Sequence, residues 1–326
     1  MPSPEISSVS LPAIDALRER LHAFLRPTPT LPVAALSDAS SPQALVAKFE
    51  LWQVTGSFKA RGALANVAAI AEEDKRYGVT AVSAGNHAIA TAFAAKAHNL
   101  HAKVVMLANA SPVRVARCEA YGAEVVMAPD VHAAFDIAED IATDEQRTFI
   151  HPFEGVTTAL GTAGVGRELI NSAPDLDAVI VPVGGGGLAA GVSAAVKLTA
   201  PHCKVFGVEP FGADSMHRSL LADTPLRLDG VSTIADSLAA PMALPTSFAL
   251  CRQFIDRVVR VSDEDLRIAM RRMHDILGLA VEPACAAALA ALEGPLAESL
   301  NGCRVGLIFC GSNIDPTTWH AQVSAR

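Results

Sequence analysis

The strongest constraint on the fold is an alternation of short β-branched runs with alanine-rich stretches of helical length. The runs are VTAVSAG from residue 79, AKVVML from 102, AEVVMA from 123, DAVIVPVG from 177 and CKVFGVE from 203, and a helix candidate follows each. Parallel strands need long crossover connections, and continuous apolar strands indicate a sheet covered on both faces. The sequence therefore predicts the α/β class with parallel sheets.

Two helices have recognisable ends. Residues 11–26, LPAIDALRERLHAFLR, carry apolar residues at helical spacing, and prolines from Pro27 onward should end this helix. In VSDEDLRIAMRRMHDILG, Ser262 precedes Asp265 by three residues, as in a capping box, and Gly278 is the expected C-cap. The sequence contains no long linker. A second domain is therefore expected to be interwoven with the first or closely packed against it.

Composition narrows the class of protein. The 326 residues are 51% hydrophobic and 18% charged, which is typical of a compact globular chain of roughly two domains. The net charge is −8 and no run of Lys or Arg could follow a phosphate backbone, so we expect no nucleic-acid partner. The N-terminus lacks the pattern of a signal peptide, and no apolar run reaches membrane-spanning length. We expect a cytoplasmic protein with no membrane partner.

The cysteines and histidines show no metal-ligand spacing. Six cysteines are scattered without a C-x-x-C pair, and the ten histidines show no spacing that would place two ligands on one helix face. This excludes both a disulfide framework and a zinc cluster, and it indicates reduced cysteines that mostly serve as small core residues.

Four consecutive glycines, Gly184–Gly187, follow the buried run VIVPV, and a helix is expected from about Leu188. Residues without a Cβ let successive backbone N–H groups converge next to the positive end of a helix. A flexible turn is the alternative, but four glycines there are entropically costly. The pattern predicts a phosphate cradle.

The phosphate could belong to a dinucleotide. Gly185, Gly187 and Ala190 satisfy G-x-G-x-x-A, and Glu209 closes the next strand. An NAD-dependent dehydrogenase therefore stays open as an alternative. A Walker A site is excluded, since no glycine here precedes Lys and then Ser or Thr.

The stretch SAGNH lies between the end of a predicted strand and the start of a helix. Ser83, Gly85, Asn86 and His87 offer a hydroxyl, backbone donors, an amide and an imidazole where ligands bind in open α/β sheets. Converging donors of this kind suit a small carboxylate. Helix capping explains Ser and Asn equally well when this stretch is considered alone.

The stretch TGSFKARGA places Lys59 in the first turn of a helix, where a cation is disfavoured by the helix dipole. A lysine there should have a depressed pKa and a nucleophilic amine suited to Schiff-base chemistry, although an isolated lysine is usually a solvated surface residue. A lysine, a carboxylate loop and a cradle for one phosphate are together the parts that hold pyridoxal 5′-phosphate (PLP) and an amino acid.

These motifs, in this order, resemble the serine/threonine dehydratases of the tryptophan-synthase-β-like, fold type II, group of PLP enzymes. The shared stretches are TGSFKARGA, SAGNHA, VGGGGLAAG, GVEP, TIADSL, VEPACAAALAAL and CGSNID, and they cover nearly the whole chain. Serine racemase is a close functional relative of these enzymes.

The resemblance implies a role for each matching residue. Lys59 would carry the cofactor as a Schiff base and remove the α-proton of the substrate, with Phe58 beside the ring. Gly184–Gly187 and the amide of Leu188 would hold the phosphate, Asn86 the ring hydroxyl, and Cys310 would face the pyridine nitrogen, with Glu282 nearby. The substrate carboxylate would lie against the loop that contains Ser83, Ala84, Gly85, Asn86 and His87.

The implied reaction is β-elimination of water from L-serine, L-threonine or a related β-hydroxy amino acid, giving a 2-oxo acid and ammonia. Ala84 stands where racemases of this family place a second serine, which disfavours racemisation. β-Replacement, as in cysteine synthase, an amino-acid racemase and a non-catalytic PLP-binding protein stay open as alternatives.

The resemblance also implies an architecture. A large PLP-binding domain would contain residues 1–52 and 150–326, and a smaller domain, residues 53–149, would carry the asparagine loop. Relatives are usually homodimers. No C-terminal regulatory domain is expected. Of the cation site of the racemases, Glu209 and Ala213 match but the third position is Ser215, so we expect no metal, with Glu209 a weak candidate ligand.

Overall fold

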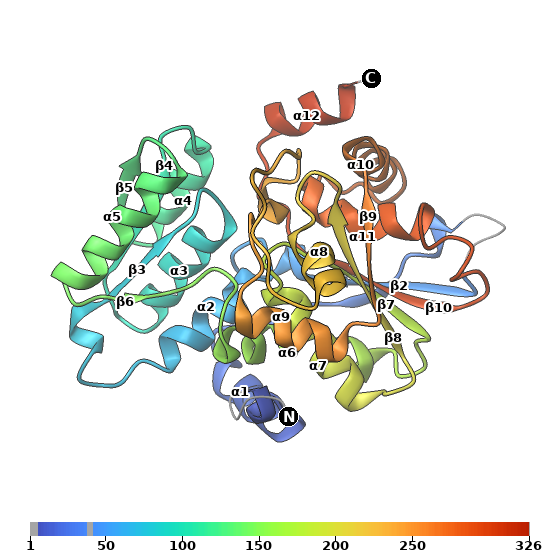
Figure 1. The fold of residues 1–326 in the computed structure, drawn as a ribbon, viewed down its shortest axis with the longest axis horizontal. Helices are drawn as coiled ribbons and strands as arrows, with labels where there is room; N and C mark the ends of the chain where they lie inside the picture. The colour runs from blue at the N-terminus through green and yellow to red at the C-terminus, as the bar shows by residue number, and fades with distance from the viewer. Residues whose placement is uncertain (1–5, 38–41, 326) are drawn as a thin grey trace.

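The computed structural model describes residues 6–37 and 42–325 and contains two sheets (Figure 1). The larger has the order β1-β2-β10-β7-β8-β9 and the smaller has the order β5-β4-β3-β6. The larger sheet consists of β1 (Thr30–Pro32), β2 (Ala44–Phe49), β7 (Ala178–Pro182), β8 (Lys204–Pro210), β9 (Arg257–Val261) and β10 (Arg304–Phe309). The smaller consists of β3 (Val79–Val82), β4 (Ala102–Leu107), β5 (Glu124–Ala128) and β6 (Thr148–Phe149).

Neighbouring strands are parallel except for β1 and β2, which are antiparallel. In the centre of the larger sheet β7 pairs with β8 so that Val181 lies opposite Gly207, and β10 pairs with β7 so that Leu307 lies opposite Ile180. All five β-branched runs of the sequence form strands. The predicted α/β class with parallel sheets is confirmed.

Helices connect the strands. They are α1 (Leu11–Leu21), α2 (Lys59–Ala68), α3 (Asn86–Ala97), α4 (Pro112–Ala120), α5 (Val131–Asp144), α6 (Val156–Ser172), α7 (Gly187–Thr199), α8 (Ser215–Ala222), α9 (Pro245–Phe254), α10 (Asp263–Leu277), α11 (Pro283–Glu293) and α12 (Pro316–Ser324). Short 3₁₀ helices are η1 (Ile6–Ser8), η2 (Ala34–Leu36), η3 (Glu50–Trp52), η4 (Lys75–Tyr77) and η5 (Asp236–Leu238). Among the described residues, no helix is long and apolar enough to span a bilayer.

The predicted helix ends agree with the structure for α10 and differ for α1. Ser262 and Asp265 form a capping box at the start of α10, and Gly278 has φ 68° at its C-cap. The first helix ends at Leu21 instead of continuing to residue 26, because the N–H of His22 bonds to the carbonyl of Glu19 and tightens the last turn.

Helices cover both faces of the sheets. In the smaller sheet, Val104 of β4 packs with residues of α2 and α3, whereas its neighbour Val105 packs with residues of α5. Helix α1 joins the two parts of the molecule, because Ile14 belongs to the core of the larger sheet and Leu21 to that of the smaller. The domain boundaries at residues 53 and 149 stay a prediction.

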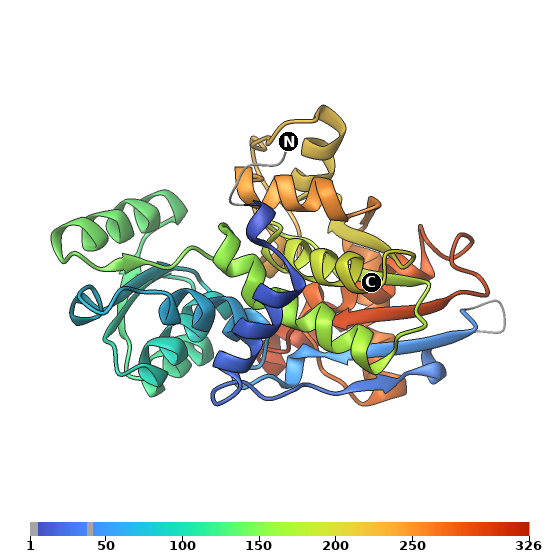
Figure 2. The ribbon, with the colours of Figure 1, turned by 90° about the horizontal axis from the view of Figure 1, so that it is seen from below.

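The chain passes twice between the two sheets. It leaves the larger sheet after β2 and reaches the smaller through η3 and α2, and it returns after β6 through residues 150–155 and α6. Seen from below, α2 and α6 lie side by side between the two sheets (Figure 2). The residues that line the candidate site come largely from these two passages and from the strand ends beside them.

Candidate active site

One pocket gathers most of the predicted site residues. It is lined by Phe58, Lys59, Asn86, Phe153, Pro182, Gly184, Gly185, Gly186, Gly187, Leu188, Ser237, Leu238, Glu282, Ala284 and Cys310. These residues come from seven segments of the sequence, spread between residues 58 and 310. Every residue that the sequence assigned to the cofactor is among them.

Lys59 is the first residue of α2, as predicted. Its Nζ donates a hydrogen bond to the carbonyl oxygen of Pro152 at 2.5 Å and lies 5.1 Å from the centroid of the Phe58 ring. Burial lowers the pKa of Lys59 to about 8, against the opposing effects of Cys310 and Glu282. The predicted depression of the pKa is confirmed, but its cause is removal of the ammonium from water and not mainly the helix dipole.

The tetraglycine turn leads from β7 into α7 with room for backbone only. Gly186 has φ +94°, in the left-handed region that favours glycine. A Cβ on Gly185 would overlap the ring of Phe153, and one on Gly187 would lie 2.6 Å from the carbonyl oxygen of Phe153. The first N–H groups of α7 have no intrahelical acceptor. This donor set at the helix start fits an anionic phosphate.

The asparagine loop connects β3 to α3. Asn86, the first residue of α3, donates from Nδ2 to Glu282 Oε1 and Oε2 at 2.8 and 3.0 Å. The N–H of Gly85 donates to Ser83 Oγ at 3.0 Å. These bonds hold the loop against the pocket that contains Lys59.

The side chain of His87 is turned away from this loop. Its Nε2 lies 2.7 Å from the carbonyl oxygen of Ile150, and burial lowers its pKa to about 3. A neutral ring beside a carbonyl must donate from Nε2. The imidazole is therefore committed to Ile150, and the His87 group that stays available at the helix start is its backbone N–H.

Glu282 is buried at the N-cap of α11, but its side chain does not cap that helix. Its carboxylate receives the bonds from Asn86, and Ser237 Oγ donates to Oε2 at 3.5 Å. Burial raises the pKa of Glu282 to about 7, and the neighbouring Asp236 adds to this shift. The carboxylate therefore bonds to groups at the pocket instead of to the N–H groups of its own helix.

Cys310 follows β10 at the end of the pocket and is buried. Its carbonyl oxygen accepts a hydrogen bond from the N–H of Phe58 at 3.0 Å, which ties the Lys59 segment to this strand end. A hydrogen bond with Cys285 raises the pKa of the Cys310 thiol, and burial adds to the shift. The thiol is therefore neutral. All six cysteines are free, as predicted.

Several residues of the site were missed from the sequence. Arg114 of α4 donates to Asp236 Oδ2 at 2.7 Å and to the carbonyl oxygen of Asn313 at 3.1 Å. His151 accepts the N–H groups of Phe153 and Glu154 on Nδ1, and burial lowers its pKa to about 4. Asn313 lies in the quoted stretch CGSNID and could have been singled out there, whereas Arg114 and His151 carry no local signal.

The candidate cation site does not fit a divalent cation. The two carboxylate oxygens of Glu209 accept the N–H groups of Met216 and His217 at 2.9 and 2.7 Å. Asp214 is paired with Arg218 at 2.8 Å and with Arg260 at 3.0 Å. Among the described residues, no group of three or more His, Cys, Asp and Glu side chains is placed to hold a metal ion. Because both carboxylates already have partners, we derive no step through a cation.

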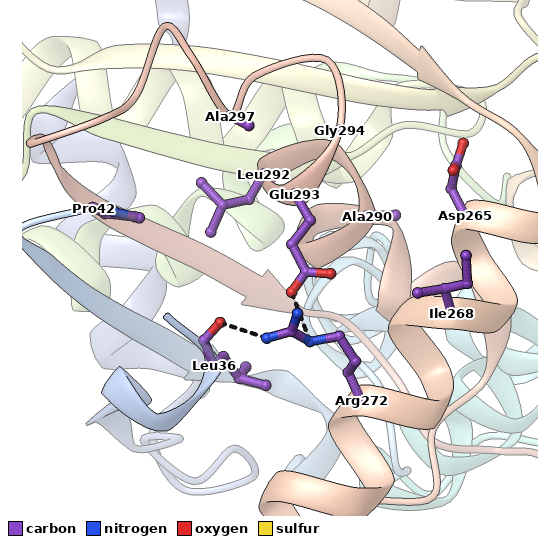
Figure 3. Close-up of a pocket in the computed structure, with 10 residues that line it drawn as sticks. All are labelled: Leu36, Pro42, Asp265, Ile268, Arg272, Ala290, Leu292, Glu293, Gly294 and Ala297. Atoms are coloured by element: carbon purple, nitrogen blue, oxygen red, sulfur yellow. Dashed lines mark hydrogen bonds and ion pairs between the residues drawn. The ribbon is translucent and has the colours of Figure 1, made fainter. Parts of the chain in front are cut away.

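Two larger cavities lie outside the pocket. One, of about 750 Å³, adjoins it through Glu282 and is bordered by Arg114, Asp236 and Asn313. The other, of about 350 Å³, lies against α10 and α11 (Figure 3). In it Arg272 Nε lies 3.1 Å from Glu293 Oε1, and Arg272 donates to the carbonyl oxygen of Leu36. This second cavity contains none of the predicted site residues.

Comparison with known proteins decides whether the phosphate cradle binds PLP or NAD. The sequence pattern of the family described as pyridoxal-phosphate dependent enzymes matches residues 21–311. The chain belongs to this family. The NAD alternative is thereby rejected, in agreement with the Glu209 carboxylate being occupied by backbone N–H groups.

Individual relatives support the same conclusion. The chain is 50% identical over 318 residues to phenylserine dehydratase of Ralstonia pickettii, covering 97% of each protein. It is similar to the structure of maize serine racemase, with a TM-score of 0.90, 30% identity and 96% of each chain covered. For the processed form of threonine deaminase isoform 2 from Solanum lycopersicum, the TM-score is 0.92 at 30% identity, with 99% and 88% covered.

The predicted family, fold type and PLP cofactor are confirmed by these findings. The family and the dehydratase and ammonia-lyase relatives support a PLP-dependent lyase, and these relatives are consistent with β-elimination.

Proposed function

We propose that this lyase is a dehydratase whose substrate is a β-hydroxy amino acid with an aryl group on Cβ, of which 3-phenylserine is the simplest. The relative that acts on phenylserine shares half of its residues with this chain over nearly the full length of both proteins. L-Serine and L-threonine are the next substrates to test, because other relatives are threonine ammonia-lyases. The products would be a 2-oxo acid and ammonia.

The pocket residues would hold the cofactor through complementary contacts. The backbone N–H groups of Gly184–Gly187 and Leu188 would bind the phosphate, and Lys59 would hold the aldehyde carbon covalently. Asn86 would donate to the ring hydroxyl. The neutral thiol of Cys310 would face the pyridine nitrogen, where it supplies no charge comparable to that of a carboxylate. The donor set, the glycine cradle and the buried amine all support this arrangement.

Bound PLP supplies an electron sink for the charge left on the α-carbon when its proton is removed. Lys59 would act as the base, taking the α-proton on Nζ. A pKa of about 8 leaves a useful fraction of this amine unprotonated near neutral pH, which an amine with the ordinary pKa of 10.5 would not provide. The β-hydroxyl would leave as water by taking up the proton held on Lys59 Nζ, and hydrolysis of the released enamine would give the 2-oxo acid and ammonia.

The asparagine loop would orient the substrate by its carboxylate. Ser83, Ala84, Gly85, Asn86 and the backbone N–H of His87 lie at the positive end of α3, which favours an anion. The cavity bordered by Arg114 and Asp236 adjoins the cofactor pocket through Glu282 and would leave room for substituents larger than those of serine. Fixing the carboxylate would place the α-proton toward the base on Lys59.

Racemisation is the second candidate, since serine racemases are among the relatives. It requires a proton donor on the face of the α-carbon opposite Lys59. Ala84 provides no hydroxyl at the position where the racemases have one, which favours elimination over racemisation. β-Replacement with an external nucleophile would use the same lysine and is tested separately below.

The observation that carries this proposal is the buried amine of Lys59, with its lowered pKa, in the same pocket as the tetraglycine turn. The test is an absorption spectrum of the purified protein, followed by a panel of L- and D-amino acids assayed for 2-oxo acid. We expect a visible PLP band and the highest kcat/KM with 3-phenylserine. Faster turnover of serine and threonine would reject the aryl preference alone, and a change in chirality without 2-oxo acid would favour the racemase.

The same panel with sulfide added separates hydrolysis from β-replacement, since only the latter forms a new thiol amino acid. We further propose a homodimer located in the cytoplasm, with the domain division at residues 53–149. Light scattering, cell fractionation and limited proteolysis test these three statements.

A further inference from the structure

A chain of hydrogen bonds runs from α4 to the pocket through two asparagine amides. Arg117 donates to Oδ1 of Asn313. Asn313 Nδ2 donates to Oδ1 of Asn86 at 2.5 Å, and Asn86 Nδ2 donates to Glu282. The two asparagines are 7% and 5% exposed, so water does not replace these partners easily.

The chemistry of the end groups fixes the direction of every bond in this chain. An arginine can only donate, so it must face the oxygen of the Asn313 amide. A backbone carbonyl can only accept, and that of Thr55 receives the other side of the same amide at 2.8 Å. Asn313 therefore presents its nitrogen to Asn86, which must accept with its own oxygen. The nitrogen of Asn86 then faces the pocket.

The surroundings leave Asn313 no alternative position. Gly56 has φ +76°, and a Cβ at this residue would overlap the amide of Asn313. The main chain is held as well, because the N–H of Ser312 donates to the carbonyl oxygen of Gly56 at 3.0 Å and the carbonyl oxygen of Asn313 accepts from Arg114. The amide is thus confined between Gly56, Thr55 and Arg117.

We propose that Asn313, oriented by Arg117, is a positioning residue that fixes the amide of Asn86 with its N–H donors toward the cofactor ring. The inference rests on the proposed role of Asn86 at the ring hydroxyl. An amide nitrogen has two N–H donors, and one N–H shared by the two carboxylate oxygens of Glu282 would leave the other for the ring. A donor at the ring oxygen favours its ionised form, whereas the oxygen of a reversed amide would favour the protonated form.

The decisive variant is Asn313→Asp, which keeps the shape of the side chain but cannot donate from a carboxylate. Without the donor, Asn86 is free to reverse its amide. We expect the bound cofactor to lose visible absorbance in favour of a near-ultraviolet band, and its affinity to fall about 10- to 100-fold, as for other outer-shell partners. Both quantities are measured by titrating the variant with PLP at fixed pH, apart from any assay of turnover.

The matched control is Asn66→Asp. Asn66 also donates from Nδ2 to a backbone carbonyl, that of Gly62, and to Thr158 Oγ1, but it lies on the far part of α2 outside the pocket. In the Asn66→Asp variant, the ratio of the visible to the near-ultraviolet PLP band should equal that of the parent protein. A shift in this control as large as that of Asn313→Asp would overturn the proposal, because the effect would then come from general loosening.

A second pair of variants keeps the test decisive if Asn313→Asp does not fold. Arg117→Lys retains a donor and should resemble the parent, whereas Arg117→Met should shift the bands as Asn313→Asp does but less, since the carbonyl of Thr55 still holds Asn313. Equal spectra for both Arg117 variants, or an unchanged Asn313→Asp spectrum, would overturn the positioning role alone. A parent protein without a visible PLP band would instead reject the proposed function and this role with it.

Discussion

Lys59 and Arg61 lie two residues apart at the start of α2, and both are buried, but their surroundings differ. Arg61 bonds to Glu50 and Glu168 through four contacts of 2.8 Å. Burial by itself would lower the pKa of Arg61, but the two carboxylates outweigh it and raise that pKa. Lys59 bonds to the neutral carbonyl of Pro152, and burial lowers its pKa to about 8.

Lys48 extends the comparison, because it belongs to the Arg61 cluster. Its Nζ lies 2.5 Å from Glu168 Oε2 and donates to the carbonyl oxygen of Thr28, yet burial lowers its pKa too, against the opposing effect of Glu168. A shifted pKa therefore does not distinguish a functional lysine from a structural one. The groups around the amine distinguish the two. Lys48 is paired with a carboxylate, whereas Lys59 lines a pocket together with glycines and an asparagine amide.

The largest expected effect is on chemistry at Lys59. Lys59→Ala removes both the base and the covalent link, so we expect turnover to fall by more than about 1,000-fold and the visible PLP band to disappear. Stability of the folded chain should change little, because an amine that is costly to bury is removed. Spectra and 2-oxo acid release measure the loss, with Lys75→Ala, a half-buried lysine outside the pocket, as the control. Undiminished turnover would reject the assignment.

For Arg61→Met we expect the opposite outcome, a loss of stability instead of a loss of chemistry. The substitution leaves the buried Glu50 without its guanidinium and Glu168 with Lys48 as its nearest remaining cation, and breaking a buried ion pair in this way costs about 3–5 kcal/mol of unfolding free energy. Adding Glu50→Gln should recover part of this loss, and Arg252→Met, in an exposed pair with Asp223, should cost under about 1 kcal/mol. Denaturant unfolding measures all of them. If Arg61→Met remained stable but lost its visible PLP band, Arg61 would serve the cofactor site instead of stability. That result would contradict the contrast between Arg61 and Lys59.

A third test uses pH to compare Lys59 with an ordinary lysine. Capture of PLP by the cofactor-free protein needs the unprotonated amine. Its rate should rise about tenfold per pH unit below the pKa of Lys59 and become level above about pH 8. Stopped-flow absorbance between about pH 6 and 10 follows this directly. A rate that continues to rise toward pH 10 would mean that burial does not lower this pKa.

The smallest effect is expected from removal of cations. Glu209 and Asp214 already have backbone and arginine partners, so a chelator should change kcat/KM by less than about twofold. The activity is compared in chelator and in added Mg²⁺. A large activation by Mg²⁺ would show that the arginines on Asp214 are displaced by the ion. The double variant Ser215→Asp, Arg260→Ala should gain sensitivity to Mg²⁺ that the parent lacks.

Much of this architecture could be predicted, because it depends on local pattern. The five strands, the capping box at Ser262 and the start of α2 at Lys59 follow from periodicity and helix ends. The contacts of Arg114 and Asn313 could not be predicted this way. They join segments about 200 residues apart, and only the folded chain, which places α4 beside the loop after β10, brings them together.

The same limit explains the less accurate inferences. The helix dipole was a local reason for the pKa of Lys59, but burial, which depends on the whole fold, is the larger cause. The imidazole of His87 looked available in the sequence because its partner, the carbonyl of Ile150, belongs to the return passage 63 residues later.

The two passages between the sheets are joined by several contacts, among them the Arg61–Glu168 pair, the bond from Asn66 to Thr158 and the hydrogen bond from Lys59 Nζ to the carbonyl oxygen of Pro152. Any hinge motion that moves the smaller sheet relative to the larger must bend the chain at these passages, on either side of the reactive amine. Opening to admit substrate and release of product would thus strain the same few bonds that aim the base, so the speed of the hinge and the accuracy of proton transfer cannot be tuned independently.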